Sequence, residues 1–368
     1  MLSLSKPTNF SINKAISDAT GKGGKEIYDE FLDVLDIRYE MLAKSVSDNE
    51  VKGKIIQEKG TANLFPVWNE DASKIAYQSN QNHDYFGITD LFIYDTKNHS
   101  NEKLVANVFS KPTWNGDKII YSKKALRGNK VGSKFYDLFE FNLKTKKETR
   151  LTKDARAFSP VYIPNDSILF YLAVDDGTQN IYKINLSTKL TEPITNYSKR
   201  EIISGLNYDK RNHRLSYDLT VNHFRGIHYL SLSDSTSGAI LNNVLWDQRQ
   251  SVFSNNEIIF SEDRTGIFNL YMIKQDKQGY LTNVTGGAFM PDINKNGSIV
   301  FSLYENGKYK IAVLDSAQIL DDANIGYTPQ YFQRNKNLSL PLTESINLES
   351  EKYKDHFPPI FTLSLIHI

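Results

Sequence analysis

The sequence contains no cysteine. This absence excludes disulfide bonds, a thiolate nucleophile and cysteine-ligated zinc or iron–sulfur sites, and it leaves the redox environment open. Histidine is sparse as well: seven residues are scattered along the chain, and the closest pair is His223 and His228. We expect this pair to span a turn, so the sequence predicts neither a metal site nor a cofactor.

Motifs that carry catalysis are also missing. No G-x-S-x-G, His-Glu-x-x-His, Walker loop or dinucleotide-binding G-x-G-x-x-G occurs, and the glycines at 21–24 precede a predicted helix without following a strand. The adjacent carboxylates Asp175-Asp176, Glu262-Asp263 and Asp321-Asp322 are typical of turns rather than of a catalytic pair or a calcium site. We therefore predict that this chain has no catalytic function of its own.

The charge is balanced, with 44 basic and 43 acidic residues and a net charge of +1. No overall field favours nucleic acid or an anionic membrane, and no run approaches the roughly 20 apolar residues of a membrane helix. The N-terminal ten residues lack the apolar core of a signal peptide. Charge is uneven locally, because Lys118–Arg156 contains 12 Lys or Arg residues against four acids. This segment is either an ordinary solvated surface or a dock for an acidic protein or polymer.

Helical periodicity is confined to residues 9–46. Asn9 or Ser11 could cap a short helix that ends before Gly21, and a second helix is expected from about Lys25. The second helix has one apolar face, formed by Ile27, Phe31, Val34, Leu35, Leu42 and Val46. Two short helices cannot bury this face alone, so we expect them to cap the next domain or to be the remnant of another.

From Val51 onward the pattern becomes that of strands, and one unit recurs. The aromatic residues that end the second strand of each unit lie 41 to 49 residues apart: Tyr77, Tyr121, Phe170, Tyr217, Phe260 and Phe301. A period of about 40–50 residues is typical of propeller blades. The third strands also align, as in DLFIYD at 90–95 and NLYMIK at 269–274. The sequence therefore predicts an all-β fold, a six-bladed β-propeller with a short N-terminal helical segment and an irregular C-terminal tail.

The sixth unit contains only three predicted strands, whereas residues 52–60 form a spare strand ahead of the first unit. We expect this strand to complete the sixth blade, because an open ring would leave unpaired edges. The predicted organisation is a helical segment at 1–50, the propeller at 51–320, and a linker or the start of a further domain at 321–368.

Residues 65–80, FPVWNEDASKIAYQSN, resemble the repeat of TolB-type propellers, which reads roughly P-x-W-S-P-D-G-x-x-I-A-F-x-S. The matches include Pro66, Trp68 and Asp71, whereas Asn69, Glu70 and Ala72 depart from the pattern. The resemblance covers about residues 52–320 and is specific for the fold rather than for a ligand. It implies a non-catalytic scaffold that binds a protein or peptide within a larger bacterial envelope protein, in the periplasm or at the outer membrane.

The N-terminal segment resembles the last helices of a gluzincin-type peptidase domain. This resemblance implies an alternative in which the propeller gates or docks substrate for a zinc peptidase encoded upstream. A propeller half of a prolyl oligopeptidase-type enzyme and a glycan- or polymer-binding propeller are further alternatives. No His-Glu-x-x-His occurs here, so the peptidase ligands are not in this chain.

Recognition by a propeller is expected on one face, where the loops from second to third strands meet the loops that enter each blade. Arginine and aromatic side chains are common recognition anchors. The candidate binding residues on this face are Tyr85, Phe86, Arg127, Arg156, Arg200, Arg225 and Arg264. The sequence identifies no ligand, oligomeric state or partner.

Overall fold

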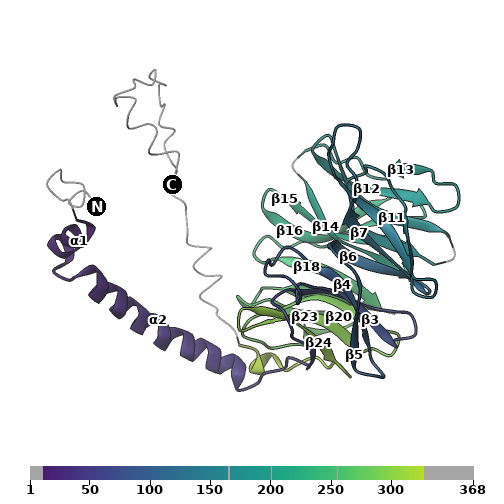
Figure 1. Ribbon diagram of the computed structural model, residues 1–368. Helices are drawn as coiled ribbons and strands as arrows, with labels where there is room; N and C mark the ends of the chain where they lie inside the picture. The colour runs from purple at the N-terminus through teal and green to yellow at the C-terminus, as the bar shows by residue number, and fades with distance from the viewer. Residues whose placement is uncertain (1–10, 165, 200, 255, 327–368) are drawn as a thin grey trace, which may run out of the picture. The chain divides into compact units, whose positions relative to one another are not determined.

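The computed structural model describes residues 11–164, 166–199, 201–254 and 256–326. Its strands form six four-stranded antiparallel sheets, which are the blades of a propeller (Figure 1). Blade 1 contains β2 (Asn63–Trp68), β3 (Lys74–Ser79), β4 (Asp90–Asp95) and β5 (Ser100–Val105). Blade 2 contains β6 (Val108–Asn115), β7 (Lys118–Lys124), β8 (Tyr136–Asn142) and β9 (Lys147–Arg150). Blade 3 contains β10 (Ala157–Ile163), β11 (Ile168–Asp175), β12 (Thr178–Asn185) and β13 (Thr191–Pro193).

The remaining blades follow the same order. Blade 4 contains β14 (Ile202–Asp209), β15 (Arg214–Val221), β16 (Phe224–Ser231) and β17 (Ser237–Leu241). Blade 5 contains β18 (Gln248–Ser254), β19 (Glu257–Glu262), β20 (Asn269–Lys274) and β21 (Lys277–Tyr280). Blade 6 contains β22 (Ala288–Ile293), β23 (Ile299–Glu305), β24 (Lys308–Leu314) and, as its outer strand, β1 (Lys54–Gln57). The predicted six-bladed propeller is confirmed.

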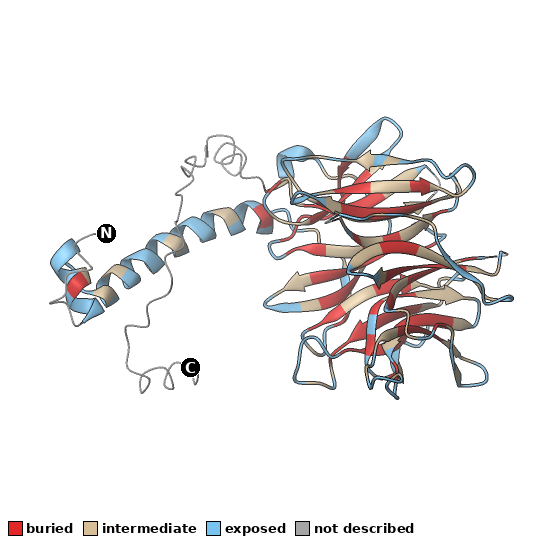
Figure 2. Cartoon of the chain, turned by 90° about the horizontal axis from the view of Figure 1, so that it is seen from above, coloured by how far each residue is buried: buried red, intermediate tan, exposed pale blue. Residues whose placement is uncertain are grey.

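Apolar residues on the second strands form the core between blades (Figure 2). The six aromatic residues used to align the repeat are all buried, none more than 4% exposed: Tyr77, Tyr121, Phe170, Tyr217, Phe260 and Phe301. A middle strand is covered on both faces by neighbouring blades, so its side chains are apolar on both sides. The alignment read from the sequence was therefore an alignment of core positions.

Each inner strand contains a β-bulge near its start. The bulged residues have positive φ, between 50° and 67°: Phe65, Ser110, Ser159, Gly205, Gln250 and Met290. The repeated prolines lie at these bulges, since Pro66, Pro160 and Pro291 each follow a bulged residue directly and Pro112 follows one position later. Their recurrence in the sequence predicts prolines at the start of each inner strand, where a ladder donor can be spared. A bulge takes a backbone N–H out of the ladder, so proline is tolerated inside the strand.

The ring is closed by the strand that precedes blade 1, as predicted. β1 pairs with β24 in antiparallel register, with Lys54 opposite Val313 and Gln57 opposite Ile311. The chain enters β1 through Gly53, which has a φ of 70°. A Cβ atom there would lie 2.7 Å from the carbonyl oxygen of Val313, so both the conformation and the space require glycine.

A polar clasp joins the third strand of several blades to the connection that leaves the fourth. In blade 5, the Thr282 hydroxyl donates to Asn269 Oδ1 over 3.0 Å and accepts from the backbone N–H of Leu270 over 2.9 Å. Thr152 with Asp137 and Thr195 with Asn180 make the same pair of contacts in blades 2 and 3. These threonines end three short segments that recur after the fourth strands, RLT at 150–152, PIT at 193–195 and YLT at 280–282.

Two helices precede the propeller, α1 (Ile12–Thr20) and α2 (Gly24–Ser47). Gly21 ends α1 in the left-handed conformation, as expected from the sequence. Among the described residues of these helices only Ala15 and Val46 are buried. The apolar face of α2 is therefore largely unburied, and no described helix is long and apolar enough to cross a membrane.

The segments on either side of the propeller meet at Asn283. Its side-chain amide nitrogen lies 3.3, 3.1 and 3.1 Å from the carbonyl oxygens of Val46, Asn49 and Asn324. Residues 322–324 form a 3-10 turn, so chain beyond Leu320, where we expected the pattern to end, still packs on blade 5. The tail predicted at 321–368 otherwise lies outside the described residues.

Candidate functional site

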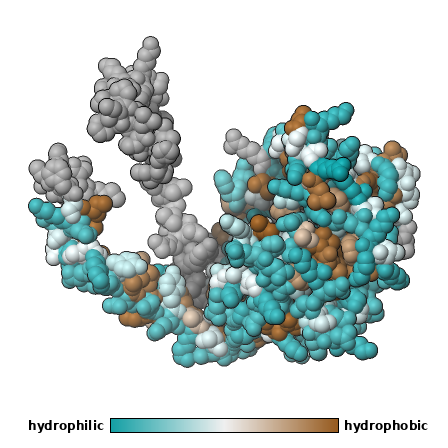
Figure 3. Space-filling model, in the orientation of Figure 1, coloured by the Kyte–Doolittle hydropathy of each residue, from teal (hydrophilic) through white to brown (hydrophobic). Residues whose placement is uncertain are grey.

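The exposed apolar side chains of the propeller gather on one face. We call it the loop face: it holds the connections from second to third strands and the connections that enter each blade. Apart from Leu190, every exposed large apolar side chain among the described residues of the propeller lies there: Tyr85, Phe86, Ile88, Phe109, Leu126, Val131, Ile202, Val221, Phe224, Val244 and Leu245. Apolar patches interrupt the hydrophilic surface of the blades in Figure 3. Apolar surface concentrated in this way is typical of an interaction site.

Aromatic rings form an arc on the loop face across blades 5, 6 and 1. Phe268 lies 5.1 Å from Phe289, Phe289 lies 5.9 Å from Tyr309, and Tyr309 lies 6.1 Å from Phe86, measured between ring centroids. Arg249 stacks on Phe268 at 4.1 Å. Phe289 and Arg249 each directly precede a bulged residue, Met290 and Gln250 respectively. The bulges therefore set where the side chains of Phe289 and Arg249 lie on the loop face.

A second arc crosses blades 2 and 3. Phe109, which also precedes a bulged residue, lies 4.6 Å from Tyr136 and 6.4 Å from Phe158. The Lys124 ammonium lies 5.2 Å from the ring of Tyr136. We call the two arcs together the aromatic rim, formed by Phe86, Phe109, Tyr136, Phe158, Phe268, Phe289 and Tyr309. All seven rings are partly or fully exposed.

Cations on the loop face of blades 4 and 5 are neutralised by acids. Arg249 lies 2.5 Å and Arg225 3.7 Å from the carboxylate of Asp247. Arg264 lies 3.0 Å from Glu262, which is fully buried, and its guanidinium stacks on Trp246 and Tyr271. Burial raises the pKa of Glu262 and Arg264 opposes this effect. Arg264 is thus a structural counterion as much as a surface group.

Cations at the border of blades 2 and 3 are not neutralised. The β7–β8 loop presents Arg127, Lys130 and Lys134, and Arg156 lies beside it with its guanidinium 4.4 Å from the ring of Phe135. None of these four side chains forms a salt bridge within the described part of the chain. This sector of the loop face therefore carries free positive charge.

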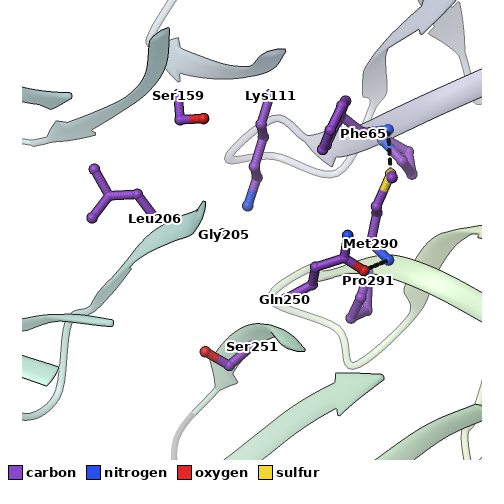
Figure 4. Close-up of a pocket in the computed structure, with 10 residues that line it drawn as sticks. Phe65, Lys111, Ser159, Gly205, Leu206, Gln250, Ser251, Met290 and Pro291 are labelled. Carbon is purple, nitrogen blue, oxygen red and sulfur yellow. Dashed lines mark hydrogen bonds between the residues drawn. The ribbon is translucent and has the colours of Figure 1, made fainter. Parts of the chain in front are cut away.

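The six bulges surround a narrow cavity on the propeller axis, which we call the neck (Figure 4). Its volume of about 40 Å³ holds a few water molecules at most. Lys111 extends into it, and burial lowers the pKa of its ammonium while Asp292 and Asp218 oppose the change. Hydrogen bonds run from bulge to bulge around it: Met290 donates its N–H to Gln250 Oε1 over 2.8 Å, and the Phe65 N–H lies 3.4 Å from Met290 Sδ.

The structure brings some of the predicted binding residues together and separates others. Phe86 belongs to the aromatic rim and Tyr85, 72% exposed, precedes it in the same loop. Arg127 and Arg156 belong to the free cations of blades 2 and 3, whereas Arg225 and Arg264 contact acids. Arg200 lies outside the described residues. The rest of the aromatic rim was missed, although Phe109, Phe158 and Phe289 share one repeat position that an alignment of blades could have shown.

No group of three or more His, Asp or Glu side chains suited to a metal occurs in the part of the chain that the structure describes. The loop face is an apolar and aromatic surface with positive charge on one side. Such a surface is suited to binding a partner.

No protein-family model matches the sequence, and no curated protein matches it significantly. Among solved structures, TolB from Acinetobacter baumannii matches with a TM-score of 0.52 and 15% identity, over 68% of this chain and 66% of that one. Putative TolB from Agrobacterium tumefaciens matches with a TM-score of 0.52 and 13% identity, over 69% of this chain and 90% of that one. This chain thus spans just under two thirds of the Acinetobacter protein. At these identities the likeness concerns the fold, and the fold is a TolB-like six-bladed β-propeller.

Proposed function

We propose that this propeller is a non-catalytic recognition module that binds a protein or peptide segment across the aromatic rim. The observation that carries the proposal is the asymmetry of the surface, because, in the part of the propeller that the structure describes, every large exposed apolar side chain except Leu190 lies on the loop face. An apolar surface confined to one side stabilises a complex by being removed from water.

The shape of the site favours a ligand that lies across the loop face rather than one that enters the neck. The neck is too small to admit a large side chain of a ligand. In contrast, Phe86 and Phe109 of the aromatic rim are 53% and 45% exposed. Aromatic side chains supply large contact areas at a low cost in conformational entropy, and they are enriched among residues that dominate binding energy. The TolB-like fold supplies a rigid scaffold for such a surface.

The test is selection of peptides from a phage-displayed random library on the immobilised full chain, followed by titration of the selected peptides in solution. We expect the double variant Phe86→Ser/Phe109→Ser to bind them at least about tenfold more weakly, since buried aromatic contacts dominate such interfaces. Leu190→Ser removes an apolar side chain that is even more exposed, at 74%, from the opposite face and should leave the affinity unchanged. Selected peptides that bind the double variant as tightly as the parent would show that the rim is not the site.

We further propose that α1 and α2 are the end of a gluzincin-type helical domain encoded upstream, for which the propeller docks or gates substrate. The exposed apolar side chains of α2, which include Phe31, Val34 and Met41, support this role because they need a covering partner. Sequencing the locus beyond Met1 tests it. A continuous reading frame with a helix bearing His-Glu-x-x-His is the expected result, and a frame that encodes no helical domain would overturn it.

The proposed location is the bacterial cell envelope, in the periplasm or at the outer membrane, and it rests on the resemblance to TolB-type repeats. Fractionation of the source cells with an antibody against the propeller tests this proposal. Recovery in the periplasmic or outer-membrane fraction is expected, and recovery with cytoplasmic markers would contradict it.

A further inference from the structure

We infer that the partner of the aromatic rim is an acidic segment whose carboxylates are bound by the β7–β8 loop and Arg156. This inference rests on the proposed function, and it adds the chemistry of the ligand and its direction across the face. It is carried by the difference between the two sides of the rim, one with neutralised cations and one with free cations.

The neutralised side shows what the fold does with cations that it needs for itself. Arg225 and Arg249 share Asp247, and Arg264 is paired with buried Glu262. A negatively charged ligand would find little net positive charge there. Arg249 also packs on Phe268, so its guanidinium has a partner above and beside it.

The free side differs in composition as well as in pairing. From Lys118 to Tyr136 the chain contains no acid, and Asp137, which comes next, is fully buried and bound to Arg150. Asp154, the acid nearest to Arg156 in sequence, pairs with Arg150 instead, at 3.6 Å. Arg127, Lys130, Lys134 and Arg156 are all exposed. Like charges held together without counterions favour the binding of an anionic partner.

The β7–β8 loop is ordered by its own hydrogen bonds. Asn129 Oδ1 accepts from the backbone N–H groups of Val131 and Ser133, each over 3.0 Å, and Asn129 donates its own N–H to the carbonyl oxygen of Ser133 over 2.8 Å. A Cβ atom on Gly128 would lie 2.6 Å from the carbonyl oxygen of Gly132, so the two arms of the loop touch. The cations are therefore presented by a formed loop, which lowers the entropic cost of binding.

The loop and the rim form one surface. Lys124, where β7 ends, stacks on Tyr136, where β8 begins, and Tyr136 stacks on Phe109. Leu126 and Val131 are each 81% exposed within the basic loop. An acidic peptide with apolar or aromatic side chains matches both features, with its rings on the rim and its carboxylates towards blade 2. A purely anionic polymer would leave the apolar part of the surface unmatched.

The experiment uses the full chain and a fluorescein-labelled random copolymer of glutamate and tyrosine, titrated by fluorescence anisotropy. The test variant is Arg127→Gln/Lys130→Gln/Lys134→Gln/Arg156→Gln. The control variant, Lys147→Gln/Lys189→Gln/Lys277→Gln/Lys295→Gln, removes four positive charges from exposed positions away from the loop face. We expect the test variant to bind about tenfold or more weakly with a shallower dependence on salt, and the control to bind like the parent.

Three results would overturn the inference: equal binding by the test variant, equally tight binding of a lysine–tyrosine copolymer, or binding only to vesicles of phosphatidylcholine and phosphatidylglycerol in equal parts. The last result would identify a lipid surface as the anionic partner. The outcomes also separate this inference from the proposed function. Library peptides that lack acidic residues and depend on Phe86 and Phe109 would support the rim as a site and reject the acidic ligand.

Discussion

The carboxylate of Asp218, on the second strand of blade 4, accepts a hydrogen bond of 2.8 Å from the backbone N–H of Gln250, the bulged residue of blade 5. The other oxygen of Asp218 faces Gly205, where a Cβ atom would lie 2.4 Å away. The bulge of one blade is thus held by a side chain of the blade before it. Burial raises the pKa of Asp218 to about 6, and the Gln250 N–H opposes this rise without reversing it.

This pKa makes stability depend on pH. Because the folded pKa lies above the usual value of 3.8, the folded state holds a proton that the unfolded state releases, so the free energy of unfolding falls as pH rises from about 4 to about 6. The loss amounts to roughly 3 kcal/mol at most. Asp218→Asn keeps an acceptor for Gln250 and should unfold at a higher temperature than the parent at neutral pH. Below about pH 3, where the carboxyl is protonated in both states, the difference should vanish. Equal destabilisation at both pH values would contradict this assignment.

Thr282→Val tests the polar clasp of blade 5. The substitution preserves volume but leaves the buried Asn269 oxygen without the hydroxyl and the Leu270 N–H without its acceptor. We expect a loss of about 1–3 kcal/mol in the free energy of unfolding, measured by denaturant titration. Thr145→Val, on an exposed hairpin, is the control and should change little. A negligible effect of Thr282→Val would mean that the clasp is not a stabilising element.

The repeat, the number of blades and the closing strand could all be predicted from the sequence. Each depends on local periodicity, or on the physical demand that no edge strand stay unpaired. The recurrence of the prolines is visible in the sequence, but it predicts strand starts rather than bulges. A bulge is a shift in the pairing with the neighbouring strand, and the sequence of one strand alone does not reveal that shift. A glycine after a polar residue also predicts a turn at Arg225-Gly226, and this prediction is wrong. Both residues lie in β16, and the turn is formed by Asn222 and His223, which have φ angles of 48° and 73°.

Removal of β1 tests closure of the ring. Without residues 1–57, β24 loses its partner along residues 311–313 and becomes an edge strand there, and Ile55 no longer packs against the core of blades 5 and 6. We expect this truncation to lower the melting temperature and to promote aggregation, as judged by light scattering. Removal of residues 1–47 alone deletes both helices but leaves β1 in place, and it should give a monomeric, cooperatively folded propeller. Indistinguishable behaviour of the two truncations would contradict a closing role for β1.

Arg264→Ala and Arg127→Ala should differ sharply, although both arginines looked equivalent in the sequence. Loss of Arg264 leaves the buried carboxylate of Glu262 without its counterion, which we expect to cost about 3–5 kcal/mol. Arg127 has an exposed side chain, so its removal should change stability by less than about 0.5 kcal/mol. Thermal unfolding at neutral pH measures both. Comparable stabilities of the two variants would show that Arg264 is not a structural counterion.

The candidate site was harder to predict than the fold for a related reason. Phe86 is separated by more than 200 residues of sequence from Phe289 and Tyr309, and only closure of the ring brings blade 1 against blade 6. Whether an arginine is free or neutralised likewise depends on which acid the neighbouring blade supplies, as Asp247 does for Arg225. Residue type was enough to predict Phe86 and Arg127 as surface candidates. For the other rings and arginines of the loop face, contacts between blades determine whether the side chain is available to a ligand.

The closing strand also determines how the protein would respond to tension. Because β1 follows α2 within a few residues, a force applied through the N-terminal segment acts first on the bridge between Val51 and Asn283 and then on the short pairing of β1 with β24. Asn283 shares this load, since it binds the carbonyl oxygens of Val46 and Asn49. Pulling on the N-terminal segment would therefore open the ring at blade 6, where β1 separates from β24, while the blades whose strands are joined by hairpins remain folded.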